Sequence, residues 1–237
     1  MVRDSAAPTA ASLIRQKRLL IYLSGMQEIM HATELEFVPK FLDVYAASNW
    51  ANCIETRKST SGMHIKLNDT LIKAFSRTQS TIALSSGEAE FTAISSGTLA
   101  GIWVRNFMRE MGFDLEIRIH SDSQAAIGMA SRIGPGRVKH LDIKTLFVQE
   151  LVKNVVSIHK VGTEDNVSDL GTKYLPTARH PQLVGMAGLY QEGQVKDFDK
   201  DKEKNNNKDK PRFHSAQALP PSACWDSRGH VCLLHRG

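Results

Sequence analysis

Apolar residues alternate with polar ones in several short stretches of the chain, which is the period of a half-buried β-strand. The clearest case is the range 62–67, where Met63, Ile65 and Leu67 alternate with His64 and Lys66. Further ranges are short and apolar enough to be strands, namely 41–46, 71–75, 117–121 and 155–161. Asn68 and Asp69 are typical of tight turns, so we predict that the ranges 62–67 and 71–75 form a hairpin.

Other segments repeat apolar residues at helical spacing. The pattern predicts helices over 12–24, 81–112, 124–130 and 140–154, and a short last helix between residues 163 and 174. Ser85 and Glu88 resemble a helix start, with a serine cap and an acid in the first turn. Leu99, Trp103 and Phe107 recur at four-residue spacing in the longest helix, and we expect them to face the core.

The predicted order of strands and helices is an α/β arrangement that carries well-separated acids at Glu90, Asp122 and Asp169. Asp122 follows the predicted strand 117–121, and α/β sheets collect ligands at the carboxyl ends of their strands. Asp122 is therefore either a metal ligand or general base, or merely the cap of the next helix, since Asp is a frequent N-cap. Glu90 lies on or beside the buried side of its helix, where a carboxylate needs a partner or a cation.

The composition fits a globular domain. Of the 237 residues 41% are hydrophobic, and the net charge of +5 fits a polyanion partner without requiring one. The three cysteines are too few for a disulfide framework, which favours an intracellular location in the cytoplasm or nucleus. No apolar run approaches the roughly 20 residues of a membrane span, so we expect no membrane partner. From about Gln191 the chain is charged and poor in large apolar residues, which predicts a disordered tail.

Six blocks carry a more specific signal when they are taken together. They are SNWA at 48–51, TRKSTSG at 56–62, ALSSGEAE at 83–90, SDSQAA at 121–126, KHLDI at 139–143, and TED at 163–165 followed by Asp169 and Thr172-Lys173. In this order and spacing they resemble the ribonuclease H region of copia-type LTR retrotransposon Pol polyproteins. The resemblance implies a segment over 1–40 that links this region to a reverse transcriptase, a ribonuclease H-like domain over 41–178, and a mostly disordered tail over 179–237.

The resemblance also implies a fold and an activity. The fold is an α/β, ribonuclease H-like one, with a five-stranded mixed sheet and helices packed on both faces. The activity is hydrolysis of the RNA strand of an RNA–DNA hybrid with two Mg²⁺ or Mn²⁺ ions, which clamp the attacking water and the leaving oxygen. The implied partners are the hybrid and, originally, the reverse transcriptase of the same polyprotein.

By motif, Glu90, Asp122 and Asp169 match three metal-binding catalytic acids of the family. The resemblance places further residues along the hybrid, where they would contact sugar, phosphate or base edges. These are Ser48, Asn49, Arg57, Lys58, Ser86 and Gln124. For the basic stretch around Arg57 and Lys58, a solvated turn is an equally good interpretation.

The first acid of the family site has no counterpart here. Relatives carry it on the first strand in a Tyr-Ser-Asp-Ala-Asp-Trp block, and in this chain its position is taken by Ala47. Asp43 faces the same side of that strand but lies four residues back, roughly 13 Å away, which is too far to replace it. We therefore expect a folded domain that binds one Mg²⁺ weakly through Asp122 and Glu90 and cleaves hybrids poorly or not at all. The alternatives are a catalytically dead nucleic-acid-binding module and a non-functional relic of the element.

Overall fold

The computed structural model describes residues 8–25, 29–31, 39–68, 70–132, 142–191, 224–225 and 231–232. The chain divides into one compact unit, residues 1–195, and a second unit, residues 196–237. In the second unit the structure describes two short strands, β8 (Cys224–Trp225) and β9 (Val231–Cys232), which pair antiparallel. The rest of the tail predicted from Gln191 lies outside the described residues.

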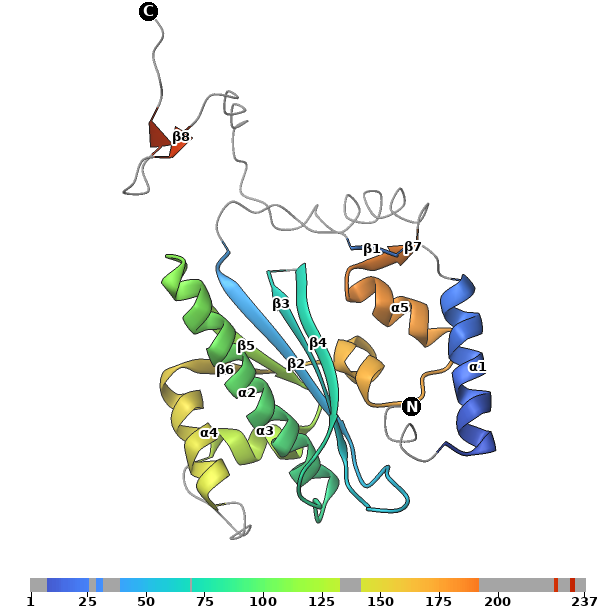
Figure 1. Ribbon diagram of the computed structural model, residues 1–237. Helices are drawn as coiled ribbons and strands as arrows, with labels where there is room; N and C mark the ends of the chain where they lie inside the picture. The colour runs from blue at the N-terminus through green and yellow to red at the C-terminus, as the bar shows by residue number, and fades with distance from the viewer. Residues whose placement is uncertain are drawn as a thin grey trace, which may run out of the picture. The chain divides into compact units, whose positions relative to one another are not determined.

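The first unit is organised around a five-stranded mixed sheet, as predicted (Figure 1). Its strands are β2 (Phe41–Asn49), β3 (Thr60–Leu67), β4 (Thr70–Thr78), β5 (Glu116–Ser121) and β6 (Val156–Lys160), in the order β4-β3-β2-β5-β6. β2, β3 and β4 run antiparallel, whereas β5 and β6 continue the sheet parallel to β2. The predicted hairpin of β3 and β4 is confirmed, and Asn68 at its turn has the left-handed φ of 51° that asparagine tolerates.

Helices α2 (Ser86–Glu110), α3 (Gln124–Ser131) and α4 (Asp142–Asn154) cover one face of this sheet (Figure 1). Two glycines bring α2 close to it. A Cβ added at Gly97 or Gly101 would lie 3.2 or 3.1 Å from the side chain of Val44 on β2. These contacts leave no room for larger residues, so the glycines set how closely α2 packs on the sheet.

The opposite face holds two 3₁₀ turns, η3 (Thr163–Asp165) and η4 (Val167–Gly171), and helix α5 (Arg179–Met186). A Cβ at Gly62 of β3 would lie 2.7 Å from the carbonyl oxygen of Ser168, so only glycine allows η4 to approach this closely. From the same face of β3, the Nζ of Lys66 donates a hydrogen bond to the carbonyl of Met186 at the end of α5, at 3.2 Å. Helical elements on both faces are therefore confirmed.

One expectation about the core is wrong. Leu99, Trp103 and Phe107 of α2 are 53%, 65% and 55% exposed and do not face the core. The side of α2 that packs on the sheet carries mostly small or medium-sized residues. They are Phe91, Ile94, Gly97, Thr98, Gly101 and Val104. Gly97 and Gly101 lie in this buried row, and hydrophobicity alone does not identify them as core positions.

Two element boundaries also differ from the prediction. α2 begins at Ser86 and not near residue 81, because Ser85 caps it by accepting a hydrogen bond from the backbone N–H of Glu88. The last helix expected between residues 163 and 174 is formed by η3 and η4. α5 lies within the range predicted to be a mostly disordered tail, and its Leu183 is fully buried.

The segment before the sheet contains α1 (Ala10–Gly25), which confirms the helix predicted over 12–24. It is followed by β1 (Ile29–His31), which pairs antiparallel with β7 (Leu189–Gln191) beyond α5. None of the helices in the described ranges combines the length and the apolar character that crossing a membrane requires.

Candidate functional site

Two carboxylates meet where the sheet and α2 adjoin. Glu90 lies in the second turn of α2, and Asp122 directly follows β5. Burial, with a smaller contribution from the negative charge of nearby Asp122, raises the pKa of Glu90 to about 7, although the hydrogen bond from the backbone N–H of Ser48 acts in the opposite direction. The Oε2 atom of Glu90 is buried without a hydrogen-bond partner among the described residues. A buried carboxylate oxygen of this kind is suited to bind a proton or a cation.

The alternative interpretation of Asp122 as a helix cap is not supported. α3 is capped by Ser123, whose Oγ accepts a hydrogen bond from the backbone N–H of Ala126 at 3.3 Å. Asp122 instead accepts a hydrogen bond from the Nδ2 of Asn166 at 3.4 Å, and the same Nδ2 lies 3.3 Å from the carbonyl oxygen of Ala46. Asn166 is fully buried and links β2 to the acid after β5.

Sequence reasoning missed Asn166. Its local signal is only that of a turn residue, because its Oδ1 also accepts a hydrogen bond from the backbone N–H of Ser168 at the start of η4. Its contacts with Ala46 and Asp122 span 120 and 44 residues, and such contacts follow from the fold.

Asp169, the third predicted ligand, lies fully buried in η4 and is held by two basic side chains. Lys173 Nζ lies 2.8 Å from its Oδ1, and Arg179 Nη2 lies 3.0 Å from its Oδ2. The structure thus brings Glu90 and Asp122 together and engages both oxygens of Asp169 in ion pairs. In the part of the chain that the structure describes, no three acidic, histidine or cysteine side chains form a group suited to a metal ion.

Ala47, at the position of the missing acid, is fully buried on β2. Its neighbours in sequence, Ala46 and Ser48, are the residues of β2 that contact Asn166 and act on Glu90. Ala47 lies between these two residues in the chain and is paired with Gly62, so its side chain points to the face of the sheet that carries η4.

Asp43 does not replace the missing acid. Its two oxygens accept hydrogen bonds from Arg118 at 2.8 and 2.6 Å, and its Oδ1 lies 2.6 Å from Nε2 of His120. Burial alone would raise the pKa of Asp43, but the hydrogen bonds from His120 and Arg118 hold it below its ordinary value. Asp43 is therefore a paired anion within the sheet.

The predicted hybrid-contacting residues gather around the same end of β2 and β5 and differ in exposure. Ser86 and Gln124, the first residues of α2 and α3, are exposed, as is Arg57 in the loop between β2 and β3. Lys58 beside it is half-buried. Ser48 is only 4% exposed, and the Nδ2 of Asn49 donates to the carbonyl of Thr172 at 3.0 Å. The exposed members are therefore better placed to contact a ligand than Ser48 and Asn49.

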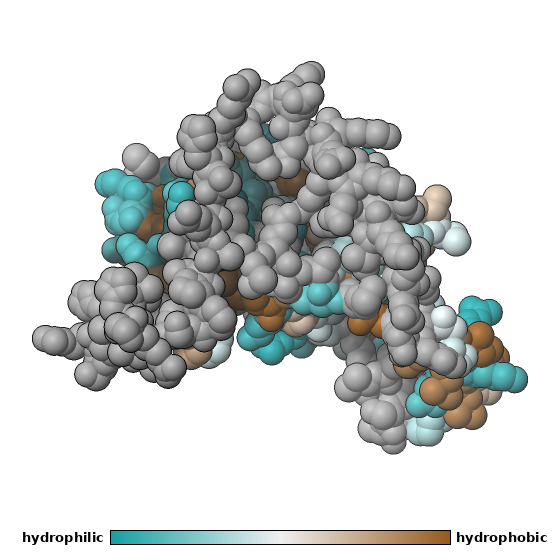
Figure 2. Space-filling model, turned by 90° about the horizontal axis from the view of Figure 1, so that it is seen from above, coloured by the Kyte–Doolittle hydropathy of each residue, from teal (hydrophilic) through white to brown (hydrophobic). Residues whose placement is uncertain are grey.

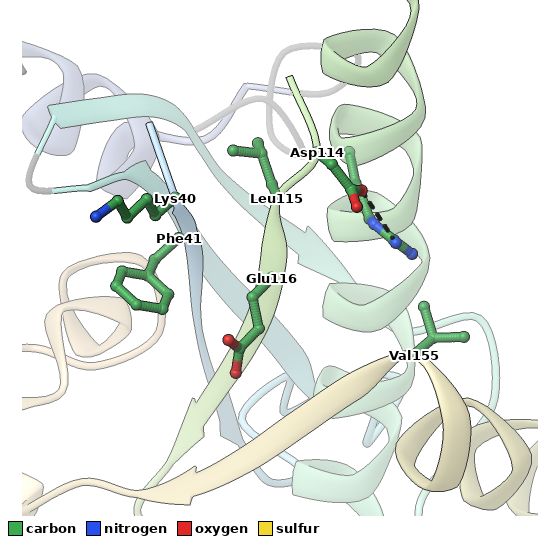
Figure 3. A pocket seen from close by; sticks show the side chains of 7 residues that line it. Lys40, Phe41, Asp114, Leu115, Glu116 and Val155 are labelled. Carbon is green, nitrogen blue, oxygen red and sulfur yellow. Dashed lines mark hydrogen bonds and ion pairs between the residues drawn. The ribbon is translucent and has the colours of Figure 1, made fainter. Parts of the chain in front are cut away.

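A pocket of about 470 Å³ lies elsewhere, at the starts of β2 and β5 (Figure 3). It is lined by Lys40, Phe41, Arg105, Asp114, Leu115, Glu116 and Val155. The ion pair between Arg105 and Asp114, at 3.3 Å, crosses this region. Asp122 follows the other end of β5, and no residue predicted for the site lines the pocket, so we do not assign the site to it.

Comparison with known proteins identifies the relatives of this chain. No family model matches it. Over 148 residues the chain is 30% identical to the retrovirus-related Pol polyprotein from transposon TNT 1-94 of Nicotiana tabacum. The aligned residues cover 60% of this chain and 11% of that polyprotein. The chain is a homologue of copia-type Pol polyproteins. It is also 28% identical over 187 residues to the Pol polyprotein from transposon RE1 of Arabidopsis thaliana, which covers 77% of this chain.

This homologue spans about one tenth of the length of those polyproteins, 11% of one and 13% of the other. Its strand order, with three antiparallel strands extended by two parallel ones, is the ribonuclease H-like fold that the resemblance implied. Among solved structures it is similar to ribonuclease H1 from the archaeon Halobacterium salinarum, with 18% identity and a TM-score of 0.41. That match covers 54% of this chain and 89% of the archaeal one.

Proposed function

We propose that this chain is a ribonuclease H-type domain that binds RNA–DNA hybrids and cleaves their RNA strand weakly or not at all. The proposal rests on one observation above all, which is that the buried Ala47 of β2 takes the position of the first acid of the family site. An alanine supplies no oxygen to bind a cation. The domain keeps two acids of the site and the surrounding fold, and it lacks the ligand that would bridge two metal ions.

The residues present fit one divalent cation. The partnerless Oε2 of Glu90 and the carboxylate of Asp122 are hard oxygen donors, and Mg²⁺ or Mn²⁺ is often held by one or two carboxylates together with waters and substrate phosphate. They fit a second cation poorly, because position 47 has no oxygen and both oxygens of Asp169 are paired with Lys173 and Arg179. A bound cation would supply charge stabilisation at the scissile phosphate.

The protein's own groups would position the hybrid. Arg57 and Lys58 carry positive charge next to the end of β2, where they can bind phosphates. Ser86 and Gln124 present a hydroxyl and an amide at the starts of α2 and α3, which suits contacts with ribose 2′-hydroxyl groups or base edges. With a pKa of about 7, Glu90 can also hold or release a proton near neutral pH.

Cleavage of a labelled RNA–DNA hybrid in Mg²⁺ tests this proposal. The natural chain should cut slowly or not at all, and Ala47→Asp should cut at least about tenfold faster, since removal of one catalytic group typically costs two or more orders of magnitude. Ala47→Asn is the matched control, because it adds similar volume without the charge and should not restore activity. Thermal melting of each variant shows whether the buried substitution still allows folding.

Two results would overturn the assignment. If the natural chain cuts at a normal rate and Asp122→Asn abolishes the cutting, another group supplies the missing oxygen. If Ala47→Asp folds but remains inactive, the loss of activity does not lie at position 47.

The second candidate function is a nucleic-acid-binding module without catalysis. The alanine at position 47 favours this function as much as it favours a weakly active ribonuclease H-type domain. Binding through phosphate contacts should weaken steeply with salt, because each contact releases counterions. Arg57→Gln with Lys58→Gln should weaken hybrid binding and flatten its salt dependence. A relic without function would show neither effect.

A further inference from the structure

An aromatic strip runs along one side of α2, outside the carboxylate site. Trp103 is 65% exposed and Phe107 is 55% exposed, and Leu99 continues the strip toward the start of the helix. The Trp103 and Phe107 rings lie nearly parallel, at an interplanar angle of 7°, with centroids 6.2 Å apart. Two aromatic rings held parallel on a helix surface form a flat, rigid apolar platform.

The neighbouring edge strand β4 adds positive charge to this platform. Lys73 Nζ lies 5.3 Å from the centroid of the Trp103 ring, and Arg77 Cζ lies 5.6 Å from the centroid of the Phe75 ring. Phe75 pairs with Met63, whose side chain reaches Gly97 of α2, so the alternate positions 73, 75 and 77 share the side of the sheet on which α2 lies. The platform and both cations therefore line one flank between α2 and β4.

The β4 end of this flank lies beside the turn of α2 that carries Glu90. At the end of β4, the Nε2 of Gln79 donates to the carbonyl of Ala89, the residue before Glu90. From there Arg77, Phe75 and Lys73 follow one another back along β4, while α2 runs about 20 Å from Glu90 to Trp103 at 1.5 Å per residue. Trp103 points to a different side of α2 from Glu90, because the 13 residues between them turn the helix by about 220°, so the flank is a surface separate from the carboxylate site.

We propose that the flank formed by Lys73, Phe75, Arg77, Leu99, Trp103 and Phe107 binds a single strand of nucleic acid. Bases stack on Trp103, and Lys73 and Arg77 contact phosphates. Exposed aromatic rings with neighbouring cations are the combination that single-strand binding uses, because every base has a π-face and every nucleotide carries a charge. The net charge of +5 acts in the same direction.

Two features disfavour a second copy of this chain as the occupant. β4 is an edge strand, and the exposed Lys73 and Arg77 on it oppose the addition of a strand from an identical, equally charged edge. A second copy of this basic chain would also need acidic residues to bind. On this side of α2, the described residues offer it Glu110 at the helix end. The inference extends the proposed nucleic-acid binding and does not require hybrid cleavage.

Binding of a fluorescein-labelled oligothymidine of about 12 nucleotides, followed by fluorescence anisotropy, tests the proposal. The anisotropy should rise as the natural chain binds. Trp103→Ala should weaken binding about tenfold or more, whereas Trp103→Phe should keep most of the affinity because it preserves a stacking ring. Lys73→Gln should reduce the slope of log affinity against log salt by roughly 0.7, the value for one phosphate contact of a single strand.

Leu20→Ala on α1 is the matched control, because Leu20 is 66% exposed but lies outside the flank. It should bind as the natural chain does. The proposal is wrong if Trp103→Ala binds oligothymidine as tightly as the natural chain with an unchanged melting temperature. It is also wrong if sedimentation shows a dimer that Trp103→Ala dissociates, since a second copy would then be the occupant.

Hybrid binding, measured on the same variants, separates this inference from the proposed function. Loss of hybrid binding with retained, Trp103-dependent binding of oligothymidine contradicts the proposed function and supports the flank. Hybrid binding that persists without any binding of oligothymidine contradicts the flank.

Discussion

His64 is a buried histidine within the sheet, and its ionisation should make stability depend on pH. It is 6% exposed on β3, and its Nδ1 has no hydrogen-bond partner in the described part of the chain. Burial, together with the positive charge of Lys66, lowers the pKa of His64 from 6.5 to about 4. Between pH 4 and pH 6.5, His64 is therefore more often protonated in the unfolded chain than in the folded chain.

The consequence is a loss of stability on acidification. As the pH falls from 6.5 toward 4, the free energy of unfolding should fall, by about 2 kcal/mol at pH 5 for this one residue. His64→Leu should remove that part of the pH dependence, because leucine does not titrate. Urea unfolding at pH 7 and pH 5 measures the difference.

At the scale of elements, Arg179 connects three segments on the face of the sheet opposite α2. As the first residue of α5, it pairs with Asp169 of η4, pairs with Glu164 of η3 at 3.2 Å, and donates to the carbonyl of Thr163. Asp169 is fully buried, and Arg179 is the more buried of its two basic partners. Removing one member of a buried ion pair leaves an unpaired charge, which is strongly destabilising.

Arg179→Gln should therefore lower the free energy of unfolding by roughly 2–4 kcal/mol. Hydrogen exchange should become faster in α5 and η4 and stay slow in β2, which identifies the loosened segments. Lys173→Gln is the milder comparison, because the Lys173 side chain is 35% exposed and solvent screens its ion pair. Equal effects of the two substitutions would contradict the central role of Arg179.

Helix α2 shows which features of an element can be predicted from sequence. Its cap could be predicted, because the signal of Ser85 and Glu88 is local, although the predicted range 81–112 begins too early. The carboxylate of Glu88 also accepts a hydrogen bond from the backbone N–H of Leu84 at 2.8 Å. The side of α2 that is buried could not be predicted from the sequence. The large residues Trp103 and Phe107 outweigh Gly97 and Gly101 in any hydrophobic pattern, although the glycines are the residues that touch the sheet.

The candidate site divides in the same way. Motif and position predict Glu90 and Asp122 as site residues, and in the structure the charge of Asp122 acts on the pKa of Glu90. The pairing of Asp169 with Arg179 and the contact of Asn166 with Asp122 join residues from separate elements. Such contacts are decided by how elements pack, and no local pattern encodes them.

At the scale of the molecule, α1 carries a large exposed apolar surface. Six of its large apolar side chains are at least 45% exposed: Leu13, Ile14, Leu20, Ile21, Tyr22 and Leu23. Figure 2 shows brown and teal residues side by side at the right of the view, on the side where α1 lies in Figure 1. Ser12 is the buried residue of this helix, and Tyr22 meets His180 of α5 edge-on with ring centroids 6.1 Å apart. An apolar helix surface this open favours association.

Removal of α1 should therefore change association more than folding. A chain that begins at residue 26 keeps β1, the five-stranded sheet and the helices on both its faces, so its melting temperature should stay within about 5 °C of that of the full chain. The full chain should associate as its concentration rises, and the shortened chain should remain monomeric in sedimentation experiments. Leu13→Glu with Leu20→Glu in the full chain should have the same effect without a deletion. A shortened chain that melts far lower would show that α1 contributes to the stability of the domain.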